Sequence, residues 1–328
     1  MNRFLFSIVV ITYNQESLVL ETLDSIYRQT FKNIELIISD DASQDSTVSV
    51  IERWLQKNRN RFVNTILNVN KTNLGIVKNH NVSMELYSGD FVKTLGGDDI
   101  LLDNAVEIMY DFLVNNPSAR FCSSKILSFY KKGMENVIFD SVPKERLIKK
   151  IAGADQAEML KLILRENFVP APGTFFRRSL LEDYGHVDES FELIEDWPQW
   201  IKFILNGEKI YFLDKPTVLY RVHKKSVNAS AFNTGNTKYY SDILKVYKNY
   251  ILPNVDRLPL PDAISAVTRA KIYSELLKNG IGEKNYRKIR FYRLADPIWW
   301  LNIPYWIPRK VEYYVKYKRI FNEIFGDE

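Results

Sequence analysis

Asp98 and Asp99 are two adjacent carboxylates whose position in the sequence suggests chemistry. They follow an apolar segment, residues 91–95, and the flexible pair Gly96-Gly97. Two like charges side by side repel each other, so the chain must supply a compensating cation for them or use them to hold one. Glycines at this point let the backbone approach a ligand closely. The alternative interpretation is a turn in which both aspartates cap local amide groups.

A second acidic pair, Glu195 and Asp196, comes shortly before Pro198. Proline fits the first turn of a helix and Gly207 follows the last apolar residues, so a helix is predicted that has Pro198 in its first turn and runs to Leu205. Both acids then project from the entry to that helix. Their alternative role is to complement the positive end of the helix dipole.

The first hundred residues alternate short β-rich runs with helical patterns, which indicates parallel βαβ units. We expect strands over residues 6–11, 34–39, 62–69 and 90–95. The fold class is therefore α/β, with a mostly parallel central sheet and flanking helices. No Gly-x-Gly-x-x-Gly sequence or Walker-type lysine loop occurs, which argues against dinucleotide and P-loop sites.

Polar residues gather where each expected strand ends. In an open parallel sheet this edge binds ligands, so the four groups are predicted to converge on one site. In chain order they are Thr12-Tyr13-Asn14, Asp40-Asp41, Asn70 with Asn73, and Asp98-Asp99. Helix starts also need hydrogen-bond acceptors, so some of these residues, and Asp103, are alternatively helix caps.

Beyond the first hundred residues the pattern is more mixed. A helix is predicted over residues 104–115, and the polar stretch 131–150 is interpreted as a loop or an insertion. Residues 218–223 have the pattern of a last core strand, which ends with His223. A lone histidine is more often a packed or surface residue than a ligand. Helices are expected over residues 239–252 and 263–277.

The composition is that of an ordinary globular protein, with 46% hydrophobic and 26% charged residues in a chain of 328. The single cysteine, Cys122, excludes an internal disulfide framework and suits the cytoplasm. Residues 1–11 are interpreted as the start of the first strand, because no small residues of a signal-cleavage site follow them. No apolar run has the length needed to cross a bilayer, so membrane contact is expected to be peripheral.

The end of the chain is basic and aromatic. Residues 284–319 hold ten Lys and Arg and two acids, while the whole chain has a net charge of +5, so the remainder is acidic on balance. The same stretch contains Trp299, Trp300 and Trp306. Such a segment is typical of an interfacial membrane anchor and would also suit nucleic acid. The alternative is a helical appendage that packs on the domain or on a second subunit.

Five segments of the chain, in this order, together resemble the inverting family 2 glycosyltransferases with the GT-A fold. They are Ser7-Ile8-Val9-Val10-Ile11-Thr12-Tyr13-Asn14, Ile38-Ser39-Asp40-Asp41-Ala42-Ser43, Asn73-Leu74-Gly75 with Lys78-Asn79, Gly97-Asp98-Asp99, and Glu195-Asp196-Trp197. The resemblance implies a Rossmann-like GT-A catalytic domain over residues 1–230. A helical C-terminal extension, residues 231–328, lies outside it.

The resemblance also implies a nucleotide-binding set. Its members are Thr12, Tyr13, Asn14, Asp40, Asp41, Asn73, Lys78 and Asp98. Tyr13 would pack on the nucleobase, Asp41 would accept its imide hydrogen, and Asp98 would bind the ribose. Lys78 stands where relatives often have arginine, and it would pair with a phosphate or a base carbonyl without arginine's planar fork.

The implied reaction is a single displacement that inverts the anomeric carbon of the sugar. Asp99 would hold Mn²⁺ or Mg²⁺ on the diphosphate, and His223 would complete the metal shell. Asp196 is the candidate general base for the acceptor hydroxyl, and Glu195 would position the acceptor or the donor sugar. A Gln-x-x-Arg-Trp motif, which processive relatives carry, is missing from the sequence. We therefore expect transfer of one sugar or a few.

The expected activity is that of a hexosyltransferase-type enzyme of polysaccharide biosynthesis. Its donor would be a UDP-sugar, and its acceptor a glycan or a lipid-linked glycan. The protein would contact the inner face of the cell membrane peripherally through residues 289–319. Self-association would give a homo-oligomer, and nucleic acid is not an expected partner. One alternative is a sugar nucleotidyltransferase, although a glycine-rich basic loop after the first strand would be expected there. The other is a non-catalytic binding module that acts through the basic tail.

Overall fold

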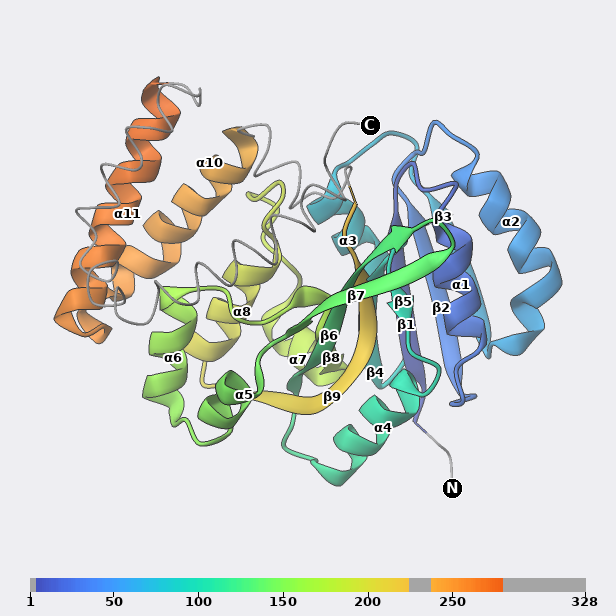
Figure 1. Ribbon diagram of the computed structural model, residues 1–328, viewed down its shortest axis with the longest axis horizontal. Coiled ribbons are helices and arrows are strands. Elements are labelled where there is room, and N and C mark those ends of the chain that lie inside the picture. Colours follow the sequence, from blue (N-terminus) through green and yellow to red (C-terminus); the bar gives the residue numbers. More distant parts are fainter. Residues whose placement is uncertain (1–3, 224–236, 280–328) are drawn as a thin grey trace. The chain divides into compact units, whose positions relative to one another are not determined.

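The computed structural model describes residues 4–223 and 237–279 (Figure 1). They form two compact units. The first comprises residues 4–163, 167–190 and 195–221, and the second comprises residues 164–166, 191–194, 222–223 and 237–279. The predicted domain boundary at residue 230 and the predicted membrane contact of residues 289–319 lie outside the described residues.

The first unit is built on one nine-stranded sheet with the order β3-β2-β1-β4-β8-β6-β9-β5, and β7 pairs with β6. The strands are β1 (Phe6–Thr12), β2 (Ile34–Asp40), β3 (Asn64–Val69), β4 (Phe91–Gly96), β5 (Ile100–Leu101), β6 (Phe121–Lys132), β7 (Glu135–Val142), β8 (Thr174–Arg177) and β9 (Ile210–Arg221). Strands β1 to β4 are mutually parallel, whereas β8 is antiparallel to both of its neighbours. The predicted α/β class and the first four strands are confirmed.

Helices cover the sheet because its central strands are apolar on both faces. The helices that begin in this unit are α1 (Val19–Tyr27), α2 (Thr47–Asn58), α3 (Ile76–Met84), α4 (Ala105–Asn115), α5 (Glu145–Ala152), α6 (Gln156–Arg165), α7 (Arg178–Tyr184) and α8 (Asp196–Leu205). Alternate residues of β1, Phe6, Ile8 and Val10, join the main core together with residues of α1, α2 and α4. Val9, on the opposite face of β1, is also fully buried, and α3 packs against β1 and β2. A parallel sheet covered on both faces explains the near-continuous apolar runs in the sequence.

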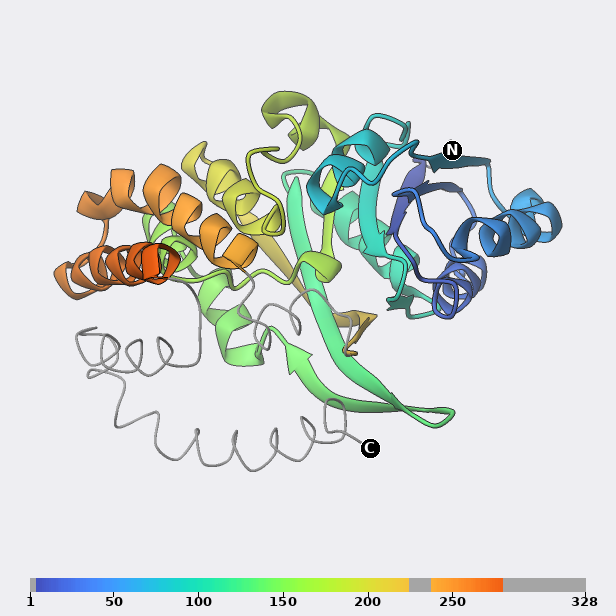
Figure 2. The same cartoon turned by 90° about the horizontal axis from the view of Figure 1, so that it is seen from above.

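The interpretation of residues 131–150 as an irregular loop is wrong. Strand β7 pairs antiparallel with β6 from Ile126 to Lys132, and helix α5 follows. The hairpin of β6 and β7 extends beyond the sheet (Figure 2), and Gly133 turns it with a positive φ of 60°. Residues of β7 are exposed or partly exposed, so the strand lacks the apolar alternation by which a half-buried strand is identified in a sequence.

The second unit contains the helices predicted for the C-terminal extension. They are α10 (Thr237–Val246), a π-helical turn η3 (Tyr247–Ile251), a 3-10 segment η4 (Leu252–Arg257) and α11 (Leu260–Asn279). Ile272 and Leu276 of α11 form a small apolar cluster with Tyr240 and Tyr273. Within the described residues, no helix is long and apolar enough to span a bilayer.

A buried glutamate joins the strands at the amino end of the sheet. Glu35 of β2 is 1% exposed and accepts hydrogen bonds from the Ser7 hydroxyl (2.6 Å), the Ser88 N–H and hydroxyl (both 2.8 Å) and the Asn64 amide (3.2 Å). Burial alone would raise the pKa of Glu35, but these donors outweigh it and lower the pKa below its usual value. The carboxylate therefore stabilises the native sheet in its charged form.

We expect Glu35→Gln to lower the free energy of unfolding by about 2 kcal/mol at pH 7, because an amide cannot accept four hydrogen bonds. A lowered native pKa gives stability that is present above the unfolded-state pKa of about 4.3 and is lost as the pH falls. Urea unfolding of both proteins at pH 7 and near pH 3 checks this. A difference between them that does not shrink at the lower pH would contradict it.

Candidate active site

Strands β1, β2 and β4 end side by side at the carboxyl edge of the sheet. Thr12 pairs with Asp40 across β1 and β2, and Ile11 pairs with Gly96 across β1 and β4. Because these strands run in the same direction, the polar groups that follow them leave the sheet at one edge. The structure therefore brings together three of the four polar groups that the sequence predicts to converge.

Asp41 holds the loop that leads into α3. Its carboxylate is 3% exposed and accepts the N–H groups of Leu74 and Gly75, both at 2.8 Å, and the side-chain amide of Asn70 at 3.0 Å. These bonds use three of its roughly four lone-pair positions. The fourth polar group, around Asn70, thus joins the same edge through Asp41. The contact of Asp41 with a nucleobase stays a prediction.

Asp40 and Asn14 shape the loops on either side of Tyr13. Both carboxylate oxygens of Asp40 accept from Ser43, from its N–H at 2.8 Å and its hydroxyl at 2.6 Å. Asn14 has a positive φ of 51°, its N–H donates to the Ser43 hydroxyl, and its side-chain oxygen accepts the Gln44 N–H at 2.7 Å. Asp40 and Asn14 are therefore occupied locally, whereas the Tyr13 side chain is exposed.

Gly97 allows the loop after β1 to approach the turn after β4. A Cβ at Gly97 would lie 2.3 Å from Oε1 of Gln15 and 3.0 Å from the Thr12 side chain. Thr12 Oγ1 donates to that same Gln15 oxygen at 2.8 Å. A side chain at residue 97 would therefore displace the Gln15 amide and crowd Thr12, so Gly97 keeps the Thr12–Gln15 hydrogen bond in place.

Asn73 and Lys78 flank the start of α3. Asn73 Oδ1 accepts the N–H of Gly75 at 3.1 Å, and Gly75 has a φ of 85° that L-residues rarely adopt. Lys78 lies in the first turn of the helix with its side chain exposed. Asn73 therefore forms the turn, and Lys78 is an exposed cation near the helix start.

Arg221, the last residue of β9, holds the turn that carries the two aspartates. Its backbone N–H donates to Asp99 Oδ1 at 2.9 Å, and its Nε donates to the carbonyl oxygen of Asp98 at 2.7 Å. Its guanidinium also pairs with Glu21 at 2.8 Å and lies 4.7 Å from the centre of the Phe129 ring. Arg221 is 2% exposed and Asp99 is 3% exposed. Arg221 is therefore one of the compensating cations that the sequence predicts for the acidic pair, and the buried Lys93 is another.

The two carboxylates nevertheless remain an electrostatic cost. Burial raises the pKa of Asp99 well above its usual value, and the charge of Asp98 raises it further. The Arg221 N–H and the charges of Lys93 and Arg221 act in the opposite direction. Lys93 is itself fully buried on β4, and burial lowers its pKa to about 7. An added divalent cation at Asp99 would favour the charged carboxylate.

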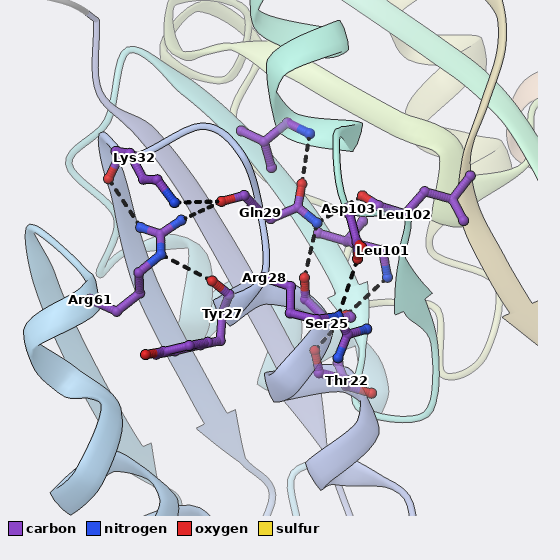
Figure 3. Close-up of polar contacts among 11 residues, drawn as sticks. Thr22, Ser25, Tyr27, Arg28, Gln29, Lys32, Arg61, Leu101, Leu102 and Asp103 are labelled. Carbon is purple, nitrogen blue, oxygen red and sulfur yellow. Dashed lines mark hydrogen bonds and ion pairs between the residues drawn. The ribbon is translucent and has the colours of Figure 1, made fainter.

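Helix α1 and the residue Gln29 after it hold β5 and the start of α4 (Figure 3), and the Leu101 N–H of β5 donates to the Ser25 hydroxyl of α1 at 3.0 Å. The Gln29 amide donates to the carbonyl oxygens of Ser25 and Leu102, and its oxygen accepts the Val106 N–H at 3.0 Å. Gln29 thereby caps α4, and Asp103 instead pairs with Arg28 at 3.2 Å. The expectation that Asp103 caps this helix is wrong, because the buried Gln29 amide, two residues after α1, accepts the Val106 N–H and the Asp103 carboxylate pairs with Arg28.

The carboxylate oxygens at this turn suit a metal ion that is held partly by the protein and partly by the phosphates of a bound substrate. Asp98 and Asp99 supply hard oxygen ligands, which suit Mg²⁺ and Mn²⁺. Among residues 4–223 and 237–279, no three His, Cys, Asp or Glu side chains form a metal-binding group. Mg²⁺ is commonly bound by one or two carboxylates together with substrate phosphates, and this turn matches that pattern. A role for His223, which belongs to the second unit, stays a prediction.

Asp196 is the first residue of α8, as the acidic pair and Pro198 predict. Its Oδ2 accepts the side-chain amide of Asn167 at 2.8 Å, and its Oδ1 accepts the Trp197 N–H at 2.6 Å. Burial raises the pKa of Asp196, although these donors oppose the rise. A raised pKa brings a carboxylate closer to the range in which it accepts a proton efficiently. Glu195 precedes it at the helix start, with its side chain partly buried.

Three residues of the site escaped the sequence reasoning. Glu21 on α1 pairs with Arg221 and with Lys131 of the hairpin, and nothing in its local sequence marks it. Asn167 contacts Asp196 from 29 positions away. Arg221 stands in the predicted strand that ends with His223, but its contact with Asp99 spans 122 positions and leaves no local signal.

Comparison with known proteins agrees with this geometry. The model of the family "Glycosyl transferase family 2" matches residues 7–185, more than half of the chain. The chain is 28% identical over 282 residues to the GalNAc(5)-diNAcBac-PP-undecaprenol beta-1,3-glucosyltransferase of Campylobacter jejuni, covering 83% of this chain and 84% of that protein. It is 27% identical over 225 residues to the putative glycosyltransferase EpsE of Bacillus subtilis, covering 67% and 73%.

Two solved structures share the fold. Residues 1–349 of S. aureus TarS in complex with UDP-GlcNAc give a TM-score of 0.58 at 20% identity, covering 89% of this chain and 82% of that one. The mannosyltransferase PcManGT from Pyrobaculum calidifontis, in complex with GDP-Man and Mn²⁺, gives 0.56 at 18% identity, covering 91% and 87%. This protein belongs to glycosyltransferase family 2 and has the GT-A fold, so it is a glycosyltransferase.

We expect Arg221→Met to destabilise the protein by about 2 to 3 kcal/mol, because it removes a buried cation and its side-chain hydrogen bonds to the Asp98 carbonyl and to Glu21. Arg28→Met is the matched control, since the ion pair of Arg28 with Asp103 is exposed and should change stability by less than about 1 kcal/mol. Urea unfolding of the three proteins measures both differences. Equal effects of the two substitutions would show that Arg221 does not hold the turn.

Proposed function

We propose that the protein transfers one sugar, or a few, from a nucleoside-diphosphate donor to an acceptor hydroxyl with inversion at the anomeric carbon. The observation that carries this proposal is the buried Asp98–Asp99 turn, held by Arg221 at the carboxyl edge of a parallel sheet. Asp41 and the loop before α3 lie at the same edge. In parallel α/β sheets this edge is where nucleotides bind.

The donor we propose is a UDP-sugar. Tyr13 offers an exposed ring for a nucleobase, and Asp41 keeps about one acceptor position for its imide hydrogen. Two of the fold neighbours are described in complex with UDP and with UDP-GlcNAc. Because another is described with GDP-Man, the nucleotide is the first property to test.

The proposed metal is Mn²⁺ or Mg²⁺, held by Asp99 with Asp98 close to the ribose. When bound, the ion supplies positive charge that stabilises the departing diphosphate as a Lewis acid. The protein's own part is to present the two carboxylates in a fixed turn. Arg221 and Gly97 do this by hydrogen bonding and by close packing.

Asp196 is the proposed general base. As the acceptor oxygen forms its bond to the anomeric carbon, the bond to the diphosphate oxygen breaks, and the diphosphate leaves with the electron pair. Asp196 takes the proton from the acceptor hydroxyl in the same displacement. Asn167 and the Trp197 N–H orient the carboxylate, and Glu195 would position the acceptor or the donor sugar.

The proposed acceptor is a lipid-linked glycan of a surface-polysaccharide pathway, met at the inner face of the cell membrane. The Campylobacter jejuni relative carries in its name an undecaprenol-linked acceptor, which supports a carrier of this kind. The basic and aromatic composition of residues 289–319 is compatible with a peripheral contact there.

A screen of UDP- and GDP-sugars for metal-dependent release of the nucleoside diphosphate tests this function. Binding of nucleotide with metal also raises the melting temperature by mass action. We expect UDP with Mn²⁺ to raise it and at least one UDP-sugar to be turned over. If no nucleotide raises the melting temperature and no donor is consumed, the proposal is wrong.

We expect Asp196→Asn to lower the transfer rate by about a hundred- to ten-thousand-fold, because an amide cannot accept the hydroxyl proton. Binding of UDP with Mn²⁺ should be unchanged, since Asp196 is not among the residues proposed to hold the nucleotide. Asp188→Asn, an exposed acid in the loop before α8, serves as the control with wild-type activity. Near-normal turnover by Asp196→Asn would refute the assignment.

A further inference from the structure

Two short segments of the second unit interrupt the first unit along the chain. Residues 164–166 lead directly into Asn167, and residues 191–194 lead directly into Glu195 and Asp196. Asn167 and Asp196 are hydrogen-bonded to each other at 2.8 Å. Asn167 and Asp196 thus each follow directly on a segment of the second unit, the unit that also contains the described helices of the C-terminal extension.

A buried carboxylate in the extension fixes the second of these segments. Asp242 of α10 is 0% exposed, and its Oδ2 accepts three successive backbone N–H groups. The donors are Glu192 at 2.8 Å, Leu193 at 2.7 Å and Ile194 at 3.3 Å. Successive N–H groups that converge on one anion form a backbone nest, which prescribes the conformation of the residues that supply it. The Asp242 carboxylate therefore dictates how the chain enters Glu195.

The nest is supported by its surroundings. Lys245, one turn further along α10, donates to Asp242 Oδ1 at 3.1 Å, so the buried carboxylate has a cation beside it. Phe191 is 2% exposed, and its ring lies 6.4 Å from that of Tyr250 and 5.7 Å from the Lys245 amine. Residues 191–194 are consequently held by packing as well as by hydrogen bonds.

An ion pair holds the first segment, residues 164–166, in a similar way. Asp262 in the first turn of α11 is 7% exposed and pairs with Arg165 at 2.9 Å. Arg165 stands two residues before Asn167. Each partner of the Asn167–Asp196 hydrogen bond is therefore preceded by a segment that a buried aspartate of the extension secures.

We propose that Asp242 is a positioning residue for the catalytic base, acting through the backbone of residues 192–194, and that Asp262 acts in the same way on Asn167 through Arg165. This inference rests on the proposed role of Asp196 as the base. It gives the C-terminal extension a part in the reaction that is separate from any role of the basic tail. Asp242 and Asp262 touch no reacting atom, so they affect geometry and leave nucleotide binding to the sheet edge.

The test compares Asp242→Asn and Asp242→Ala with the wild-type protein in steady-state transfer. A misplacement of about 1 Å at the reacting centre can cost about a hundredfold in rate, so we expect kcat to fall by about that factor for Asp242→Ala and by about tenfold for Asp242→Asn. The donor KM and the calorimetric affinity for UDP with Mn²⁺ should stay unchanged. Asp262→Asn should lower kcat in the same manner.

A double substitution separates positioning from general loss of structure. If Asp242 works through Asp196, then adding Asp242→Asn to Asp196→Asn should cause no further loss of rate, because the base is already gone. Ile272→Ala is the matched control: it removes a side chain from the apolar cluster of α11 without touching either tie. It should lower the melting temperature while kcat stays close to that of the wild-type protein.

Several results would overturn the inference. One is an unchanged kcat in both Asp242→Asn and Asp242→Ala. Another is a loss of UDP affinity that parallels the loss of kcat. A third is that Asp242→Asn lowers the rate as much in the Asp196→Asn protein as in the wild-type protein. If Asp242→Ala does not fold, Asp242→Asn decides the matter. Failure of the proposed function gives a different result: the wild-type protein then shows no transfer, or Asp196→Asn alone shows normal transfer.

Discussion

The fold of the first unit depends on how it accommodates two adjacent carboxylates at the end of a buried strand. Removing a carboxylate from water costs several kcal/mol unless hydrogen bonds and opposite charge compensate for it. Arg221 provides both, since its backbone and its guanidinium meet the Asp98–Asp99 turn while its other side pairs with Glu21 of α1. The last residue of β9 thereby connects β4, β5 and α1, which are far apart in the sequence.

This compensation is incomplete, and the electrostatic cost that remains at Asp99 bears on function. The pKa of Asp99 stays raised because of burial and the neighbouring Asp98, so the turn is less stable than a neutral one would be. A site that retains such a cost gains more from a bound cation than a relaxed site does. Proteins commonly accept local destabilisation at the residues that do chemistry and stabilise the fold elsewhere, here by satisfied groups such as Glu35.

Much of the fold followed from the sequence because its signals are local. Short apolar runs that alternate with helical patterns predict parallel strands covered by helices, and polar residues after each strand predict a ligand-binding edge. The β6–β7 hairpin was missed because β7 lacks an apolar face. The partners of Asp99 and Asp196 were missed because Arg221 and Asn167 reach them across 122 and 29 positions. The motif resemblance predicts Asp99 and Asp196 as site residues, and the structure shows which groups hydrogen-bond to them.

Calorimetric titration of UDP, with and without Mn²⁺, into the wild-type protein and into Asp99→Asn would test whether this turn binds the donor through a metal ion. In the wild-type protein we expect Mn²⁺ to raise the affinity for UDP by about tenfold or more, equivalent to about 1.4 kcal/mol. That gain should disappear in Asp99→Asn while metal-free UDP binding remains. An equal gain in both proteins would contradict the assignment of Asp99, and with it this account of the site.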